Sequence, residues 1–272
     1  MMRKTILITG STDGIGLETA RMLVSQGHRV LIHGRDPAKL EDTERMLSSL
    51  AGGEHVQSYL ADLSCMSDVE AFAAAVAEKH TKLDVLINNA GIFKTPDPMT
   101  KEGLDVRFAV NTIAPYLLIK RLLPLMESSG RVVNLSSAAQ YPVNPKALAG
   151  EVGLSDDFDA YAQSKLAITM WSRSMALKLK GEGPVFIAVN PGSMLGTKMV
   201  KDGFGVAGGD IRIGADILIR AALADEFENA SGEYFDNDSG KFASPHIDAL
   251  DAQKSEVIVN VIEAVLDRVA QE

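Results

Sequence analysis

A tyrosine and a lysine stand four positions apart in the segment YAQSK, residues 161–165. The surrounding pattern predicts a helix over 160–180, so Tyr161 and Lys165 share one helical face, a turn apart. A free phenol has a pKa of about 10, and a nearby ammonium favours the phenolate. We therefore expect Lys165 to lower the pKa of Tyr161 and make it a proton donor and acceptor near neutral pH. For the pair alone, an exposed tyrosine beside a solvated lysine is the alternative.

Three further polar side chains are candidates for the same chemistry. Ser136 and Ser137 end a predicted strand, and either hydroxyl could polarise a substrate oxygen. Asn111 lies four positions before Pro115, whose ring clashes with the carbonyl of residue 111 in a regular helix. We therefore predict a kink that frees the Asn111 carbonyl to hold a water. A polar residue that caps a broken helix would need the same kink.

The segment ITGSTDGIG, residues 8–16, places Gly10, Gly14 and Gly16 between a predicted strand and a predicted helix. A turn of this kind lets backbone approach a pyrophosphate and directs a helix N-terminus at its charge. The spacing is Gly-x-x-x-Gly-x-Gly, whereas the Rossmann fingerprint is Gly-x-Gly-x-x-Gly. By itself, this spacing favours a structural turn over a nucleotide site.

Strand-like and helix-like segments alternate along all 272 residues. The strands are short, nearly continuous apolar runs, typical of a parallel sheet covered on both faces. We predict strands at 5–9, 29–33, 55–61, 83–88, 130–136, 185–190 and 233–235. We predict helices at 16–26, 38–50, 67–79, 102–126, 160–180, 212–224 and 248–269. The predicted fold is α/β: a single doubly wound Rossmann domain over 1–272, with a mostly parallel seven-stranded sheet.

Two long connections follow strands and should lie where ligands bind in such folds. Segment 138–159 contains two prolines and an acidic cluster, and could form part of a substrate wall. Segment 193–209 is rich in glycine and methionine, which favours a mobile lid over a plain surface loop. Its apolar residues suggest a lipophilic substrate, although they could equally be packing residues. They are Met194, Leu195, Met199, Val200 and Phe204.

Composition excludes several classes of protein. The net charge of −9 argues against nucleic acid as the main partner, because phosphate neutralisation needs a basic surface. The one cysteine excludes an intramolecular disulfide and a cysteine metal cluster, and it fits a reducing compartment. The start of the chain resembles no signal peptide, and no run of about 18 apolar residues predicts a membrane span. We therefore expect a cytoplasmic protein.

Two further features predict no site of their own. The five histidines show no metal-ligand spacing, and His33 is expected to pack near an adenosine rather than to act in catalysis. The segment FDNDSG, residues 235–240, lacks the spacing and terminal glutamate of an EF-hand loop. We interpret it as a polar turn and predict no metal site.

Several stretches, taken together and in order, resemble the short-chain dehydrogenase/reductase family. They are TGSTDGIG (9–16), NNAG (88–91), Asn111 in VNTIAP, VNLSS (133–137), YAQSK (161–165) and NPG (190–192). The resemblance covers roughly residues 4–191. The long gap between Ser137 and Tyr161 and the sequence YAQSKLA resemble the retinol-dehydrogenase-like branch.

The resemblance implies hydride transfer with four catalytic residues. Ser137 would orient the substrate oxygen, and Tyr161 would exchange its proton. Lys165 would tune Tyr161 and hold the nicotinamide ribose, while Asn111 would link a water to the proton relay. The cofactor-binding residues that it implies are Gly10, Ser11, Asp13, Gly14, Ile15, Gly16, Arg35, Asp62, Leu63, Asn89, Ala90, Gly91, Tyr161, Lys165, Pro191, Gly192 and Thr197. Thr197 comes six positions after Pro191 rather than five, which leaves its nicotinamide contact open.

The end of the second strand bears on the choice between NADP and NAD. NAD enzymes of this family carry an acidic residue where this chain has Gly34, followed by Arg35. A guanidinium can bind a 2′-phosphate, which a carboxylate would repel. NADP is therefore favoured and NAD stays possible, because Asp36 and Asp13 are close in sequence.

The predicted function is an NADP(H)-dependent oxidoreductase that interconverts an alcohol and its carbonyl in a lipophilic small molecule. The alternatives are reduction of an activated C=C bond and a non-catalytic cofactor-sensing protein, although such proteins usually lose the Tyr or the Lys. Family members often pair through helices corresponding to 102–126 and 160–180, so a homodimer or homotetramer is expected, with monomers also known.

Overall fold

The structure is a computed structural model, which describes residues 2–179 and 181–271. Its strands form one sheet in the order β3-β2-β1-β4-β5-β6-β7-β8. They are β1 (Thr5–Ile8), β2 (Arg29–Gly34), β3 (Val56–Leu60), β4 (Val85–Asn88), β5 (Arg131–Leu135), β6 (Val185–Asn190), β7 (Glu233–Asp236) and β8 (Lys241–Ala243). Neighbouring strands are parallel, except that β8 runs antiparallel to β7. This arrangement confirms the doubly wound α/β fold.

The predicted number of seven strands was too low by one. The missed strand, β8, follows the turn of FDNDSG and pairs with β7 to make a hairpin. Its three residues, Lys241–Ala243, are partly or largely exposed. A segment this short carries no alternation that would distinguish it from a loop.

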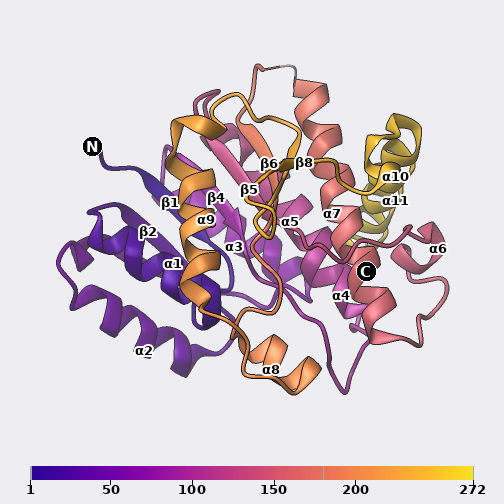
Figure 1. Cartoon of the computed structure of the whole chain (residues 1–272), viewed down its shortest axis with the longest axis horizontal. Helices are drawn as coiled ribbons and strands as arrows, with labels where there is room; N and C mark the ends of the chain where they lie inside the picture. Colours follow the sequence, from indigo (N-terminus) through magenta and orange to yellow (C-terminus); the bar gives the residue numbers. More distant parts are fainter. Residues whose placement is uncertain (1, 180, 272) are drawn as a thin grey trace.

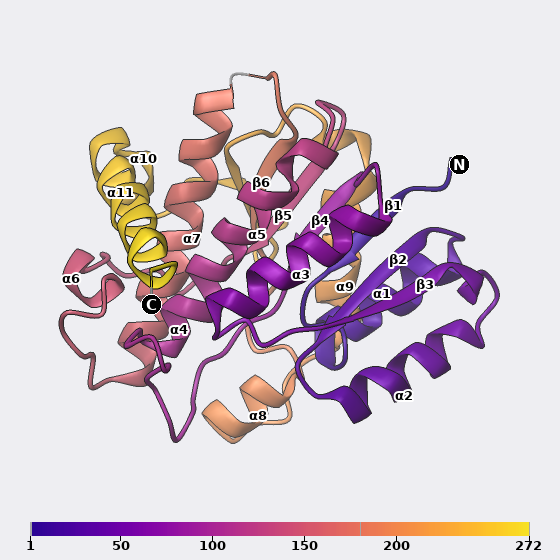
Figure 2. The ribbon, with the colours of Figure 1, turned by 180° about the vertical axis from the view of Figure 1, so that it is seen from behind.

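Helices cover both faces of the sheet. The longer ones are α1 (Gly14–Ser25), α2 (Pro37–Ser48), α3 (Met66–Lys79), α5 (Ala114–Leu122), α7 (Asp157–Leu179), α8 (Lys198–Phe204), α9 (Ile211–Leu223) and α11 (Ala252–Val269). Helices α1 and α9 lie together in front of the sheet in Figure 1, and α3, α5 and α7 lie on the other face, seen in Figure 2. Lys180, the predicted last residue of helix 160–180, lies outside the described residues.

Alternate residues of each strand face the two helical layers. In β1, Leu7 joins the core cluster that includes α3, α5 and α7, whereas Ile6 and Ile8 join the cluster beneath α1 and α9. All three side chains are 0% exposed. Burial on both faces explains why the strands are continuous apolar runs rather than alternating ones.

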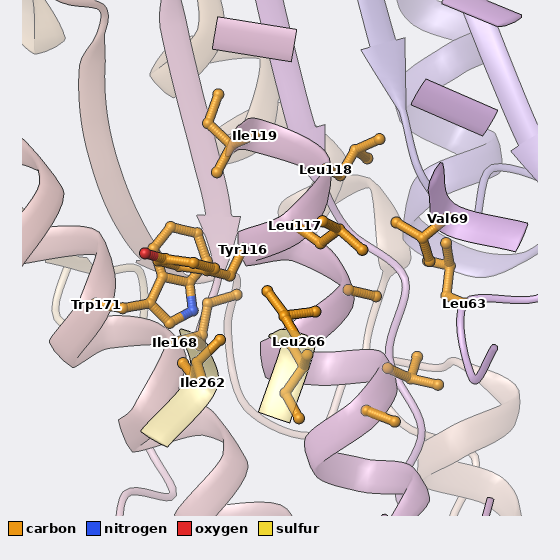
Figure 3. Close-up of a cluster of buried hydrophobic side chains, with 14 of the residues drawn as sticks. Leu63, Val69, Tyr116, Leu117, Leu118, Ile119, Ile168, Trp171, Ile262 and Leu266 are labelled. Atoms are coloured by element: carbon orange, nitrogen blue, oxygen red, sulfur yellow. The ribbon is translucent and has the colours of Figure 1, made fainter. Parts of the chain in front are cut away.

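The C-terminal helix α11 packs against α5 and α7 (Figure 3). Ile262 and Leu266 of α11 enter the same buried cluster as Tyr116 of α5 and Trp171 of α7. The Tyr116 hydroxyl also donates a hydrogen bond to Glu263 Oε1 at 2.5 Å. One face of the α5–α7 pair is therefore covered within the chain.

The predicted helix 102–126 is wrong as one continuous helix. The structure has a short α4 (Val106–Phe108), a π-helical turn (Ala109–Ile113), α5, and a 3₁₀ turn (Leu123–Leu125). Pro115 has no N–H to bond the carbonyl four positions before it, so the α-helical ladder cannot run through Asn111. The irregularity predicted at Asn111 is found as a π-helical turn, and the water at the Asn111 carbonyl stays a prediction.

A buried arginine anchors this irregular segment. Arg107 is 1% exposed, and its guanidinium binds Asp105 at 2.7 Å and Asp157, the first residue of α7, at 2.5 Å. The segment around Asn111 is thus tied to the start of the helix that carries Tyr161 and Lys165. Across residues 2–179 and 181–271, none of the helices has the length and apolar character needed to cross a membrane.

Candidate active site

A cavity of about 750 Å³ lies at the carboxyl ends of the central strands. Nearly all residues predicted from the sequence line it. They are Gly10, Asp13, Gly14, Ile15, Gly16, Arg35, Asp62, Leu63, Asn89, Ala90, Gly91, Ser137, Tyr161, Lys165, Pro191, Gly192 and Thr197. Ser11 and Asn111 do not line the cavity and instead lie behind its walls. The size falls within the range of small-molecule and cofactor sites.

Two glycines of the turn, Gly10 and Gly16, have no room for a side chain. A Cβ on Gly16 would lie 2.4 Å from both the Gly10 carbonyl oxygen and the Asn89 side-chain nitrogen. Gly10 has a φ of +63°, and a Cβ there would lie 2.8 Å from the Cα of Ala90. Asn89 Nδ2 donates a hydrogen bond to the Gly10 carbonyl oxygen at 2.9 Å and so holds the turn against the loop after β4. The bare backbone that results fits a pyrophosphate at the N-terminus of α1.

Ser11 and His33 support this turn from behind. The Ser11 hydroxyl accepts a hydrogen bond from the His33 N–H at 2.8 Å. His33 Nδ1 accepts from the Gly10 N–H at 3.0 Å, and its Nε2 lies 3.1 Å from the Ala61 carbonyl oxygen. Burial lowers the pKa of His33 to about 4, so the ring is neutral and Nε2 donates. His33 therefore lines the cavity as a support for Gly10, which sequence reasoning did not predict.

Arg35 reaches the rim of the cavity next to a crowded glycine. A Cβ on Gly34 would lie 2.5 Å from the Thr12 methyl carbon, so a side chain at 34 would displace Thr12. Arg35 is exposed at the cavity rim. The Asp36 carboxylate is turned to its own helix, where it caps α2 by accepting from the Lys39 N–H at 3.1 Å.

The two candidate serines have different surroundings. The Ser136 hydroxyl is buried and bonds the Thr169 hydroxyl at 2.6 Å and the Lys165 carbonyl at 3.1 Å. The Ser137 hydroxyl accepts from the Ala139 N–H at 3.1 Å, and Ser137 lines the cavity together with Tyr161. The Ser136 hydroxyl is thus engaged by α7, whereas hydrogen bonding by Ser137 opposes the effect of burial on the pKa of Tyr161.

The backbone of Ser137 is held by two side chains that the sequence did not indicate. The Tyr234 hydroxyl on β7 donates to the Ser137 carbonyl oxygen at 3.1 Å, and Gln140 Nε2 donates to the same oxygen at 3.0 Å. Because Tyr234 lies far away in sequence, its role depends on β7 lying close to the loop after β5.

The expected effect of Lys165 on Tyr161 is not found. Burial raises the pKa of Tyr161, and only the Ser137 hydroxyl opposes this rise. Burial also lowers the pKa of Lys165 to about 8. The ammonium lies 5.7 Å from the centroid of the Tyr161 ring and donates to the Leu135 carbonyl oxygen at 2.7 Å. Desolvation, which the spacing of two residues cannot reveal, therefore dominates both groups.

Asn111 ties the π-helical turn to the loop after β4. Its Nδ2 donates to the Ile92 carbonyl at 3.0 Å and to the Ser164 hydroxyl at 2.9 Å. Its Oδ1 accepts from the Ile92 N–H at 2.8 Å. The side chain thus fixes the segment beside Gly91, where a Cβ would lie 3.6 Å from both Asn111 Oδ1 and Lys165 Nζ.

The segment 193–209 contains α8, which was not predicted. Figures 1 and 2 show α8 at the edge of the molecule, beneath the carboxyl ends of the strands. At the base, the Gly196 N–H donates to the Gly209 oxygen at 2.7 Å. At the tip, Phe204 stacks on Phe93 with ring centroids 5.4 Å apart, and Phe93 meets the Tyr161 ring edge-on at 5.3 Å. Segment 193–209, the expected lid, thus contacts the candidate catalytic tyrosine through Phe93.

Thr197 lies against the glycine turn. Its hydroxyl caps α8 by accepting from the Val200 N–H at 3.3 Å, and its methyl carbon would lie 3.5 Å from a Cβ on Gly14. Phe158, from the proline-containing segment, completes the aromatic wall with a centroid 6.3 Å from Phe93. Among the described residues, no group of three or more His, Cys, Asp or Glu side chains could hold a metal ion.

The sheet order, the glycine turn and the cavity define a dinucleotide-binding protein of the Rossmann class. The family described as short chain dehydrogenase matches residues 4–204, and the chain belongs to that family. Human retinol dehydrogenase 13 is 29% identical over 89% of this chain and 78% of its own length. Bovine retinol dehydrogenase 12 is 34% identical over 89% of this chain and 80% of its own length.

Two solved structures resemble the whole fold. A putative uncharacterized protein from Mycobacterium paratuberculosis has a TM-score of 0.80 and 28% identity, covering 96% of this chain and 92% of its own. The RhlG/NADP active-site complex from Pseudomonas aeruginosa has a TM-score of 0.68 and 26% identity, covering 87% of this chain and 95% of its own. Family and relatives support an alcohol/carbonyl oxidoreductase with a nicotinamide cofactor.

Proposed function

We propose that this protein is an NADP(H)-dependent oxidoreductase that interconverts an alcohol and its carbonyl in a lipophilic small molecule. One observation carries the proposal. Tyr161 and Ser137 line the same cavity as a glycine turn in which Gly10 and Gly16 leave no room for a Cβ. The relatives named retinol dehydrogenases support an alcohol as one form of the substrate.

The lining residues fit a dinucleotide along the length of the cavity. The backbone of Gly10, Gly14 and Gly16 would hold the pyrophosphate. Asp62 and Leu63 would contact the adenine, and the loop after β6 together with Lys165 would hold the nicotinamide half. When bound, the nicotinamide supplies the hydride donor or acceptor.

Preference for NADP rests on the residues that follow β2. Arg35 would pair with the 2′-phosphate, and the crowding of Gly34 against Thr12 disfavours the acidic residue that would bind the ribose hydroxyls of NAD. The NADP named in the Pseudomonas complex is consistent with this preference.

Tyr161 is the proposed proton donor and acceptor. Because burial raises its pKa, the phenol holds its proton at neutral pH and is ready to donate to a carbonyl oxygen. In the opposite direction, the Ser137 hydroxyl would stabilise the phenolate and orient the substrate oxygen. After Tyr161 has donated its proton to a carbonyl, Lys165 and a water at the Asn111 carbonyl would return a proton to the phenolate.

The aromatic wall supports a lipophilic substrate. Phe93, Phe158 and Phe204 line the cavity beside Tyr161 and present apolar surface to whatever enters. The single cysteine supports a reducing compartment such as the cytoplasm. The homodimer or homotetramer stays a prediction, which light scattering at several protein concentrations tests.

The test compares Tyr161→Phe with the wild type on a panel of carbonyls and a panel of enones, with NADPH and NADH. We expect turnover to fall by about 10³-fold while NADPH binding persists, because only the exchangeable proton is lost. Tyr59→Phe is the control, since its hydroxyl bonds His80 outside the cavity. Undiminished turnover in Tyr161→Phe would refute the mechanism. Turnover of enones alone would favour C=C reduction, and binding without any turnover would favour a cofactor sensor.

A further inference from the structure

The turn of the β7–β8 hairpin touches the NPG loop at several points. The Asn237 N–H donates to the Asn190 carbonyl oxygen at 3.1 Å, and its side-chain amide donates to the Pro191 carbonyl oxygen at 2.9 Å. In return, Asn190 Nδ2 donates to Asp236 at 2.8 Å and to Asp238 at 2.9 Å. Three consecutive residues of the turn thus bond the segment after β6.

Asp238 also fixes the first residue of the lid. Its carboxylate accepts from the Ser193 N–H at 2.8 Å and from the Ser193 hydroxyl at 2.5 Å. Burial works against ionisation, but the hydrogen bonds from Ser193 and Asn190 hold the pKa of Asp238 below its ordinary value. The carboxylate is therefore charged at neutral pH, which strengthens each of these bonds.

We propose that the turn 236–238 is a positioning element, which holds loop 190–193 in the shape that receives the cofactor and fixes the hinge of lid 193–209. The proposal rests on the proposed function, because it takes the cavity beside this loop as the dinucleotide site. Pro191 has no N–H with which to bond a neighbour, and Gly192 has a φ of +118°, a conformation that its own chemistry permits but does not enforce. The hairpin turn supplies the restraint from outside.

Asp238→Asn tests the proposal, because an amide nitrogen would face donors that now meet a carboxylate oxygen. We expect hydrogen exchange over 191–209 to quicken in the free protein. We also expect NADPH to bind about tenfold more weakly, with KM for NADPH rising in step and kcat changing less than about twofold. Asp238→Glu keeps the charge and should recover part of the affinity. Ser239→Ala is the matched control, since that hydroxyl donates to Asp236 within the same turn and has no hydrogen bond to loop 190–193 among the described residues.

The readouts separate this proposal from the proposed function. A wild-type protein that binds neither NADPH nor NADH would refute the proposed function, whereas the exchange measurement still reports on the loop. If exchange over 191–209 and NADPH affinity in Asp238→Asn match the wild type, the positioning role is refuted. Should Asp238→Asn fail to fold, Ser193→Ala removes one of the same bonds from the lid side. It should shift both readouts in the same direction by a smaller amount, and unchanged readouts would again refute the role.

Discussion

The two ends of the cavity are built in different ways. At the glycine turn, backbone meets backbone, and a Cβ on Gly16 would lie 2.4 Å from its neighbours. At the lid, the first residue is held by a side chain of a distant hairpin, and the tip is held by the stack of Phe204 on Phe93 and by a hydrogen bond from Lys94 to the Gly203 carbonyl oxygen. Close packing leaves the first end a single shape, whereas the second depends on a few separable contacts. Substitutions should therefore act abruptly at the turn and gradually at the lid.

The largest effect is expected from Gly16→Ala. The new methyl group would overlap the Gly10 carbonyl oxygen and the Asn89 amide, so the turn must distort. We expect dinucleotide binding to be lost and the free energy of unfolding to fall by about 3 kcal/mol. Titration with NADPH and denaturant unfolding measure the two effects. Gly153→Ala is the control, because that position faces open space. Unchanged affinity in Gly16→Ala would show that the turn is not rigid.

Low pH should lower the free energy of unfolding through His33, which supports the glycine turn. Its folded-state pKa of about 4 lies below the ordinary value of 6.5, so folding favours the neutral ring. The contribution to stability is complete above pH 6.5 and is lost progressively as the pH falls toward 4, by about 3 kcal/mol in total. The measurement is the free energy of unfolding between pH 4 and 7 in the wild type and in His33→Gln, whose amide does not titrate. Parallel curves for the two proteins would contradict the prediction.

A more moderate effect is expected from Arg35→Asp at the rim of the rigid end. A carboxylate would repel a 2′-phosphate, so the ratio of NADP to NAD affinity should fall by at least about tenfold. Arg45→Asp makes the same charge change on the exposed surface of α2 and is the control. Binding titrations with both cofactors decide the matter. An unchanged ratio would overturn the NADP assignment.

The smallest effect is expected at the lid tip. Phe204→Ala removes the stack on Phe93 but leaves the base of the lid intact. We expect KM for the substrate to rise about threefold, with kcat and NADPH affinity nearly unchanged. Steady-state kinetics measure this, with Val206→Ala, an exposed residue on the same segment, as control. A large fall in kcat would contradict this prediction. It would show that the lid tip is rigidly coupled to Tyr161, as the glycine turn is to its neighbours.

Elements with a clear local pattern could be predicted, and those set by distant contacts could not. The central apolar runs became strands because they are buried on both faces of the sheet, whereas β3 lies at its edge and is only partly buried. The break at Asn111 followed from the missing N–H of Pro115. By contrast, β8 exists only because β7 offers it a partner, and α8 begins where Thr197 caps it inside a loop without helical periodicity.

The candidate site divides along the same line. Local spacing was enough to place Tyr161 and Lys165 one turn apart and a glycine turn after β1, although Gly14 and Gly16 belong to the first turn of α1. Only the tertiary structure distinguished Ser137 from Ser136, set both pKa directions by burial and brought the polar turn 236–238 against loop 190–193. The physical reason is that these interactions act over different distances along the chain. Backbone geometry acts over a few residues, whereas desolvation and hydrogen bonding depend on every atom that folding brings near.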